Sequence, residues 1–355
     1  MLQRALYYQN IGQEDDLERA VSLYRNTLNQ YPQETSAKIG LSQSLSGLVC
    51  RYHHPVKLAK DAQLLMEEVL NVEQNNAKAW GALGYALDCQ GNLKLAKEYY
   101  VKSAELDPNE LSSKSAAAHL LEKQGEYLIA LQWNIDIKRA MTNSPYTNLQ
   151  IARILELLGF THRAEHIYRY LFDIYIDNVH INEMLVAFLF NQGRYEEMRN
   201  VIAQTKQRKI ARTAISLLEV ELALAQNQNN IALERIEQAL STRYNSSYLL
   251  TIKNILAGAA DDEWAKEQVA YIEQLIASGD TWPDTFFEKA LIHLKVQHDI
   301  DATISTLEAL VDTGYLDINY LQKSVLFSGL RTTVPFNQLV EKMNARKSAL
   351  RQQLL

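Results

Sequence analysis

The sequence predicts an all-α protein made of repeated pairs of antiparallel helices. The chain has 355 residues, more than the ~100–200 of one globular core, so it requires two domains or a modular array. Only 13 Gly and 6 Pro are present, and these are the residues that end strands and build tight turns. A period of 34 residues runs through most of the chain, and a period of this length indicates a solenoid of stacked helical repeats.

The period is carried by small residues at one repeat position and by glycines at another. Steps of 34 residues connect, at the first position, Ala62, Ala96, Ala130, Ala164, Met198 and Ala232. The same step connects, at the second position, Gly91, Gly125, Gly159 and Gly193. A small residue is needed where the two helices of a repeat cross closely, and glycine ends a helix in the left-handed conformation without steric cost. The two rows therefore support one frame independently.

About nine repeats follow from this frame and fill residues 1–314. They begin near residues 1, 35, 77, 111, 145, 179, 213, 247 and 283. The interval from Ala20 to Ala62 is 42 residues, so eight extra residues lengthen the turn around residues 49–55. After about Gly314 the period stops. Residues 315–355 are predicted to form short helices and a final helix that cap the last repeat.

One stretch carries a known repeat signature. Residues 77–110 contain, in order, Trp80, Leu83, Gly84, Leu87, Gly91, Ala96, Tyr100 and Pro108. This spacing resembles the tetratricopeptide pattern of W-x2-L-G, a later small residue, an aromatic residue and a closing proline. The resemblance implies a right-handed superhelix in which the first helix of each repeat lines a concave groove and presents its positions 2, 5, 9, 12 and 13 there.

The expected groove positions carry aromatic and charged side chains. Position 9 runs through Tyr85, His119 and Arg153. Position 12 lies three residues further along each helix, so His119 can pair with Glu122 and Arg153 with Glu156. Either these charges satisfy one another in a wet groove, or they form a peptide site whose surplus negative charge selects a basic partner. The candidate partner-binding residues are Tyr85, Asp88, His119, Glu122, Tyr146, Arg153 and Glu156.

Catalytic and metal-binding patterns are outweighed by the repeat frame. His162, Glu165 and His166 fit the H-x-x-E-H pattern of zinc proteases, but the frame places both histidines on the outer face of a second helix. The pair His53 and His54 in the lengthened turn is a weaker metal candidate and is interpreted as a solvated loop, as is the basic run 206–212. No phosphate-binding glycine loop or nucleophile motif occurs. The sequence therefore predicts a protein that is not an enzyme, with no cofactor and no metal.

The net charge limits the classes of partner that the sequence favours, and the two cysteines limit the possible disulfides. The chain has 36 Lys and Arg against 42 Asp and Glu, a formal charge of -6, whereas nucleic-acid-binding domains usually carry a basic excess. A protein or peptide partner is therefore expected, and no nucleic acid. No run of 18 apolar residues occurs, so no membrane span is expected. Cys50 and Cys89 lie near the ends of neighbouring first helices, where a disulfide is conceivable if the lengthened turn folds back. A buried thiol at each position is the preferred interpretation.

A narrower resemblance concerns bacterial transcription regulators. Residues 5–8 and 307–315 are similar to the tetratricopeptide half of winged-helix regulators of the OmpR type, although Tyr315 stands where such tails commonly have Trp. Lys323 and Ser324 likewise replace their Asp-Pro. The resemblance implies a non-catalytic effector or sensor part that binds protein, either cytoplasmic or, behind a membrane anchor, periplasmic. The alternative is a free-standing scaffold or adaptor that assembles a secretion or envelope complex.

Overall fold

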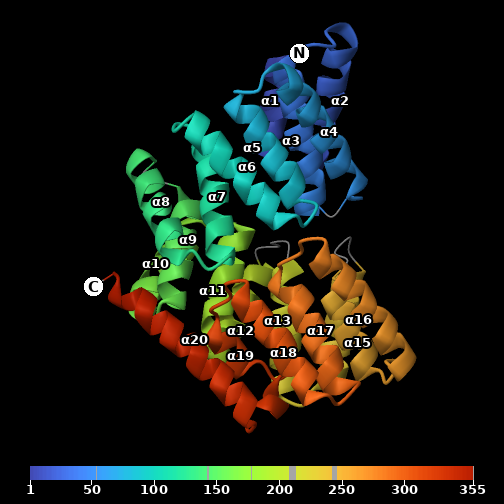
Figure 1. The fold of residues 1–355 in the computed structure, drawn as a ribbon, viewed down its shortest axis with the longest axis vertical. Coiled ribbons are helices and arrows are strands. Elements are labelled where there is room, and N and C mark those ends of the chain that lie inside the picture. Colours follow the sequence, from blue (N-terminus) through green and yellow to red (C-terminus); the bar gives the residue numbers. More distant parts are fainter. Residues whose placement is uncertain (53, 142–143, 177, 208–212, 242–245, 355) are drawn as a thin grey trace. The chain divides into compact units, whose positions relative to one another are not determined.

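Helices make up the regular structure of the described part of the chain (Figure 1). The computed structural model describes residues 1–52, 54–141, 144–176, 178–207, 213–241 and 246–354. His53 and most of the basic run, residues 208–212, lie outside these ranges. The predicted all-α repeat fold is confirmed, because consecutive helices pair with each other along the chain.

Eighteen helices make up the repeat part of the described chain. Contacts join α1 (Leu2–Ile11) with α2 (Glu14–Gln30), α3 (Thr35–Tyr52) with α4 (Lys57–Val72), α5 (Ala77–Asp88) with α6 (Leu93–Leu106), α9 (Pro145–Leu157) with α10 (Thr161–Ile174), α11 (Val179–Asn191) with α12 (Tyr195–Gln207), α13 (Thr213–Ala225) with α14 (Asn229–Leu240), and α17 (Pro283–Lys295) with α18 (Ile300–Asp312). The other helices of this part are α7 (Leu111–Lys123), α8 (Tyr127–Ala140), α15 (Ser247–Leu256) and α16 (Asp262–Ala277).

The two sequence rows have the structural roles expected of them. Every member of the small-residue row, including the larger Met198, is fully buried where the helices of a pair cross. The four glycines of the second row all have positive φ, between 71° and 83°, directly after a first helix. These residues therefore set the crossing and the turn of each pair.

By the density of contacts the chain divides into two compact units. Unit 1 comprises Met1–Leu120 and Leu275–Asp280, and unit 2 comprises Leu121–Gln274 and Thr281–Leu355.

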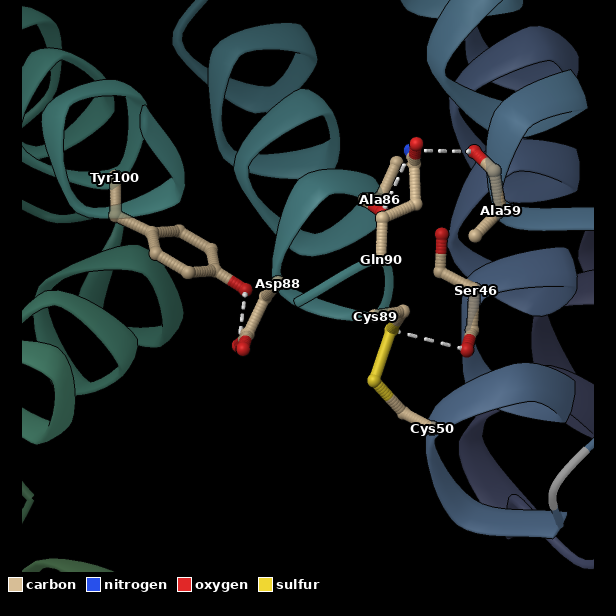
Figure 2. The surroundings of a disulfide bond; sticks show 8 residues. All are labelled: Ser46, Cys50, Ala59, Ala86, Asp88, Cys89, Gln90 and Tyr100. Carbon is tan, nitrogen blue, oxygen red and sulfur yellow. Dashed lines mark hydrogen bonds between the residues drawn. A yellow bond between two sulfur atoms is a disulfide. The ribbon is translucent and has the colours of Figure 1, made fainter. Parts of the chain in front are cut away.

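A disulfide joins Cys50 to Cys89 in unit 1, so the preferred interpretation of two buried thiols is wrong (Figure 2). The extra residues of the second repeat extend α3 to 18 residues, against 12 in α5. The added length carries Cys50 alongside the end of α5, and the two Cα atoms lie 5.1 Å apart, within the range of a disulfide. The Sγ of Cys89 also lies 3.2 Å from the carbonyl oxygen of Ser46.

The C-terminal segment of unit 2 consists of α19 (Ile318–Lys323), the 3-10 turn η1 (Ser328–Leu330) and α20 (Val334–Gln352). It contacts the last helix pair, where the Nζ of Lys342 on α20 lies 3.0 Å from the Oδ1 of Asp312 on α18. It also contacts helices that lie far earlier in the chain than the last helix pair, which a simple cap would not do. The hydroxyl of Tyr127 on α8 donates to the carbonyl of Gly314 (2.7 Å), and α19 packs on α11.

Aromatic side chains anchor this segment to unit 2. The ring of Phe287 on α17 lies 5.1 Å from that of Tyr320 and 5.7 Å from that of Phe327, measured between centroids. Phe327 and Leu330 are fully buried, and each such side chain contributes about 1.5–3 kcal/mol through burial. The segment enters at Gly314, where φ is +118° and a Cβ would lie 2.3 Å from the backbone of Gln124, so only glycine allows this approach.

Candidate functional site

A cluster of charged side chains lies on the first helices of unit 2, where the groove was expected. Arg153 and Glu156 are one turn apart on α9, and the Nη1 of Arg153 lies 3.1 Å from the Oε2 of Glu156. The other guanidinium nitrogen, Nη2, binds the Oδ2 of Asp317 at 2.6 Å. Asp317 belongs to the chain's own C-terminal segment, just before α19. The predicted pair is therefore present and has acquired a third, unpredicted member.

Neutral donors complete the cluster. The Tyr168 hydroxyl donates to Glu156 Oε2 (2.9 Å), and the Asn191 amide donates to Glu156 Oε1 (3.0 Å) and to Asp317 Oδ2 (3.0 Å). Glu156, Asn191 and Asp317 are all buried, with Glu156 only 3% exposed. A buried polar network of this kind is stable only while each member keeps its partners.

Burial and the Arg153 charge act in opposite directions on the two carboxyl groups. Burial raises the pKa of Glu156 because desolvation disfavours the carboxylate, and Arg153 only partly offsets it. Burial also works against the charged form of Asp317. There the Arg153 charge and several hydrogen bonds outweigh it and hold the pKa below its usual range. Asp317 is thus the carboxylate that neutralises Arg153.

A second buried carboxylate, Glu221 on α13, binds the same C-terminal segment. It accepts hydrogen bonds from the Tyr320 hydroxyl (3.1 Å), the Val325 backbone N–H (3.0 Å) and the Ser324 hydroxyl. Burial raises its pKa, which these donors counteract. Glu221 follows Tyr85, His119 and Arg153 in steps of 34, with residue 187 between, so extending that row along the sequence would have found it.

The other candidate residues of unit 2 have different surroundings. Glu122 is buried, with its Oε2 3.5 Å from the Nζ of Lys123. Tyr146 is 39% exposed, and its ring centroid lies 6.0 Å from that of His180. Arg153 and Glu156 pair with each other, as one of the two alternatives expected, but Glu156 is buried and Arg153 also binds the C-terminal segment, so this pair does not lie in a wet groove.

In unit 1, Tyr85, Asp88 and His119 are half-buried. A Cβ on Gly47 would lie 3.8 Å from the Tyr85 hydroxyl, so the Tyr85 side chain extends from α5 onto α3. The Tyr100 hydroxyl donates to Asp88 Oδ2 at 3.4 Å, next to the disulfide (Figure 2). Burial raises the pKa of Asp88 to about 6, and the hydrogen bond from Tyr100 opposes this.

The raised pKa of Asp88 predicts a pH-dependent stability that Asp88→Asn removes. A folded-state pKa above the unfolded value favours folding below about pH 4, and this contribution is lost as pH rises through about 6. Relative to the wild type, the Asn variant should gain about 1–3 kcal/mol of unfolding free energy between pH 4 and pH 7. Urea unfolding across this range tests it. Glu98→Gln, at an exposed position of α6, is the control and should follow the wild type. Parallel curves for Asp88→Asn would contradict the assignment.

The residues of the H-x-x-E-H pattern lie on the outer surface of one helix. His162 and His166 are exposed on α10, and Glu165 between them binds Arg169 Nε (2.8 Å) and Arg194 Nη1 (2.6 Å). In the inserted turn, the Nε2 of His54 lies 2.9 Å from the Oε1 of Glu14. Among the described helices, none combines the length and the apolar character required to cross a bilayer.

Comparisons with known proteins agree with this architecture. No family model matches the chain. A TPR repeat-containing protein of Methanocaldococcus jannaschii is 24% identical over 263 residues, 71% of this chain and 44% of its own length. The chain thus spans less than half of that relative.

Two solved structures share the fold. A tetratricopeptide repeat protein from Parabacteroides merdae has a TM-score of 0.58 and 15% identity over 72% of this chain and 97% of its own. The human IFIT1 dimer with PPP-AAAA has a TM-score of 0.52 and 11% identity over 87% of this chain and 81% of its own. At these identities the likeness is one of fold alone. The repeat signature, the helix pairs and these similar proteins together show that the chain has the tetratricopeptide-repeat fold.

Proposed function

We propose that this chain is a non-catalytic interaction scaffold that binds a protein or peptide on the first-helix face of unit 1. One observation carries the proposal. In unit 2 the inner charged residues Arg153 and Glu221 are bound by the chain's own C-terminal segment, and Glu156 is bound by Arg153 and by Asn191. In unit 1, Tyr85 and Asp88 remain half-exposed. Arg153 thus positions the C-terminal segment, Glu156 holds Arg153, and Tyr85 and Asp88 contact the partner.

The chemistry of this face favours a segment with a Lys or Arg side chain. Tyr85 offers a flat ring, and its hydroxyl stays protonated because burial raises its pKa. Asp88 is held in surroundings that disfavour its charge, so a cation docked beside it would stabilise the carboxylate. Among the described residues, no Arg or Lys forms an ion pair with Asp88. A basic side chain of the partner could therefore form a charge-assisted hydrogen bond with Asp88 without displacing another cation.

Matched substitutions test this face. Tyr85→Ala and Asp88→Lys should each reduce partner capture from the native host's lysate by at least about tenfold, as expected for the loss of a central contact. Tyr31→Ala, at a tyrosine 64% exposed in unit 1, and Glu98→Lys, on the second helix α6, remove the same chemistry elsewhere and should leave capture unchanged. The readout is quantitative mass spectrometry with circular dichroism for folding. Capture that is equal in all four variants would contradict the proposal.

We further propose that the scaffold is the effector part of a bacterial OmpR-type regulator. The support is the resemblance of residues 307–315, together with the smaller similarity of residues 5–8. An in-frame winged-helix sequence upstream of Met1 in the source genome is the expected result. A stop codon immediately upstream would contradict the regulator assignment and favour the free-standing scaffold, while leaving the binding face of unit 1 unaffected.

A further inference from the structure

We propose that Glu14, Glu18 and His54 in unit 1 form a binding site for a zinc ion. Glu14 and Glu18 are four residues apart in the first turns of α2, and His54 lies in the inserted turn after α3. One ligand atom from each of the three side chains lies within 4.8 Å of the other two. The closest pair, His54 Nε2 and Glu14 Oε1, is 2.9 Å apart.

This geometry is close to what zinc requires. At Zn–N and Zn–O distances of about 2.0–2.2 Å, ligand atoms on a tetrahedron are about 3.3–3.6 Å apart. The observed spacings therefore need changes of little more than an ångström. Glu14 is half-buried and Glu18 is exposed, so rotations of their side chains can supply these changes.

The donor set distinguishes zinc from the harder cations. An imidazole nitrogen with two carboxylate oxygens suits a borderline dication, with water as the fourth ligand. Calcium takes six to eight oxygen ligands, and magnesium binds mainly through oxygen and retains several waters, so neither suits a site with one nitrogen and two oxygens. The first turn of α2 also carries Asp15 and Asp16, so a dication would relieve the repulsion between closely spaced acids.

The inserted turn is built to hold His54 in place. The Tyr52 hydroxyl donates to the carbonyl of Gly12, directly before α2, at 2.8 Å. The His54 backbone N–H donates to the Leu48 carbonyl at 3.1 Å, and the disulfide at Cys50 ties the end of α3 to α5. The eight extra residues of the second repeat therefore hold the His54 imidazole beside α2. A metal ligand that is fixed in place before the ion binds needs such support from its surroundings.

Calorimetric titration of the untagged full chain with Zn²⁺ tests the proposal. The buffer should contain no thiol, because the disulfide then keeps both cysteines from binding the metal. We expect one Zn²⁺ per chain. His54→Ala should weaken Zn²⁺ binding at least tenfold, and so should Glu18→Gln. Because Glu18→Gln leaves the His54–Glu14 contact intact, a loss of Zn²⁺ binding in this variant distinguishes a metal site from a simple ion pair.

The second histidine pair of the chain provides the control. His162→Ala/His166→Ala removes two exposed histidines one turn apart on α10 and should leave the affinity unchanged. Zn²⁺ should also raise the melting temperature of the wild type and not that of His54→Ala. The proposal is overturned if the wild type binds no Zn²⁺, if Glu18→Gln binds as tightly as the wild type, or if only the α10 variant loses binding.

Discussion

Replacement of Arg153 by Met should lower the unfolding free energy of unit 2 by about 3–5 kcal/mol. The substitution removes the one cation among the described residues that forms an ion pair with both Glu156 and Asp317, and it leaves two buried carboxyl groups without a cation in direct contact. Desolvation of a charge is costly unless it is paired, so both groups must take up protons or lose their burial. The C-terminal segment, which Asp317 connects to Arg153 and Asn191, should then detach from α9 and α11.

A matched exposed pair is the control for this experiment. Arg139 and Asp136 are also three residues apart on one helix, 3.3 Å from each other, but the Arg139 side chain is 74% exposed. Arg139→Met should therefore cost less than about 1 kcal/mol. Adding Asp317→Asn to Arg153→Met should restore part of the lost stability, because one of the two stranded charges is removed. Denaturant unfolding provides the free energies. Equal losses for both arginines would show that the cluster does not hold the segment.

Loss of the disulfide should have the second large effect. Cys50 and Cys89 are 39 residues apart, and the chain-entropy model gives about 4 kcal/mol for closing a loop of this length. The double variant Cys50→Ser/Cys89→Ser should lose stability of that order in unit 1. Hydrogen exchange should accelerate in α3 and α5. Exchange in α9 and α11, which lie in unit 2, provides the internal reference.

A reductant distinguishes the effect of losing the disulfide bond from the effect of replacing the cysteine side chains. Dithiothreitol should destabilise the wild type by about the same amount as the double substitution and should leave the double variant unchanged. Identical exchange in α3 and α5 with and without the reductant would mean that the bond contributes no stability. The exposed position of Cys50 makes the bond accessible to such reagents.

The helix pairs were predictable because each depends on residues close in sequence. Ala96 and Gly91, for example, act within one pair, and the 34-residue step repeats their surroundings. The disulfide was harder to predict, since it depends on how far α3 continues into the inserted turn, and helix ends are weakly encoded. The repeat frame correctly predicts that Cys50 and Cys89 lie near each other, but the two cysteines form a disulfide instead of two buried thiols.

The candidate site was predictable only in part for a related reason. Positions 9 and 12 of the repeats correctly paired Arg153 with Glu156, since both are on α9. Asp317 could not be placed, because it lies 164 residues from Arg153 and outside the periodic part of the chain. The roles of Tyr85, Asp88, His119, Glu122 and Tyr146 in binding a partner stay predictions.

The bond from Tyr127 to the carbonyl of Gly314 has a consequence for the order in which the chain folds. Repeat arrays ordinarily gain structure one neighbour at a time, so an early repeat can become stable while later ones are still being synthesised. In unit 2 this bond spans 187 residues, and that from Arg153 to Asp317 spans 164. Closing such distant contacts is slow. Helices α8 to α11 must therefore leave the ribosome with their inner polar groups exposed to water, and they reach their final stability only after the C-terminal segment has been synthesised.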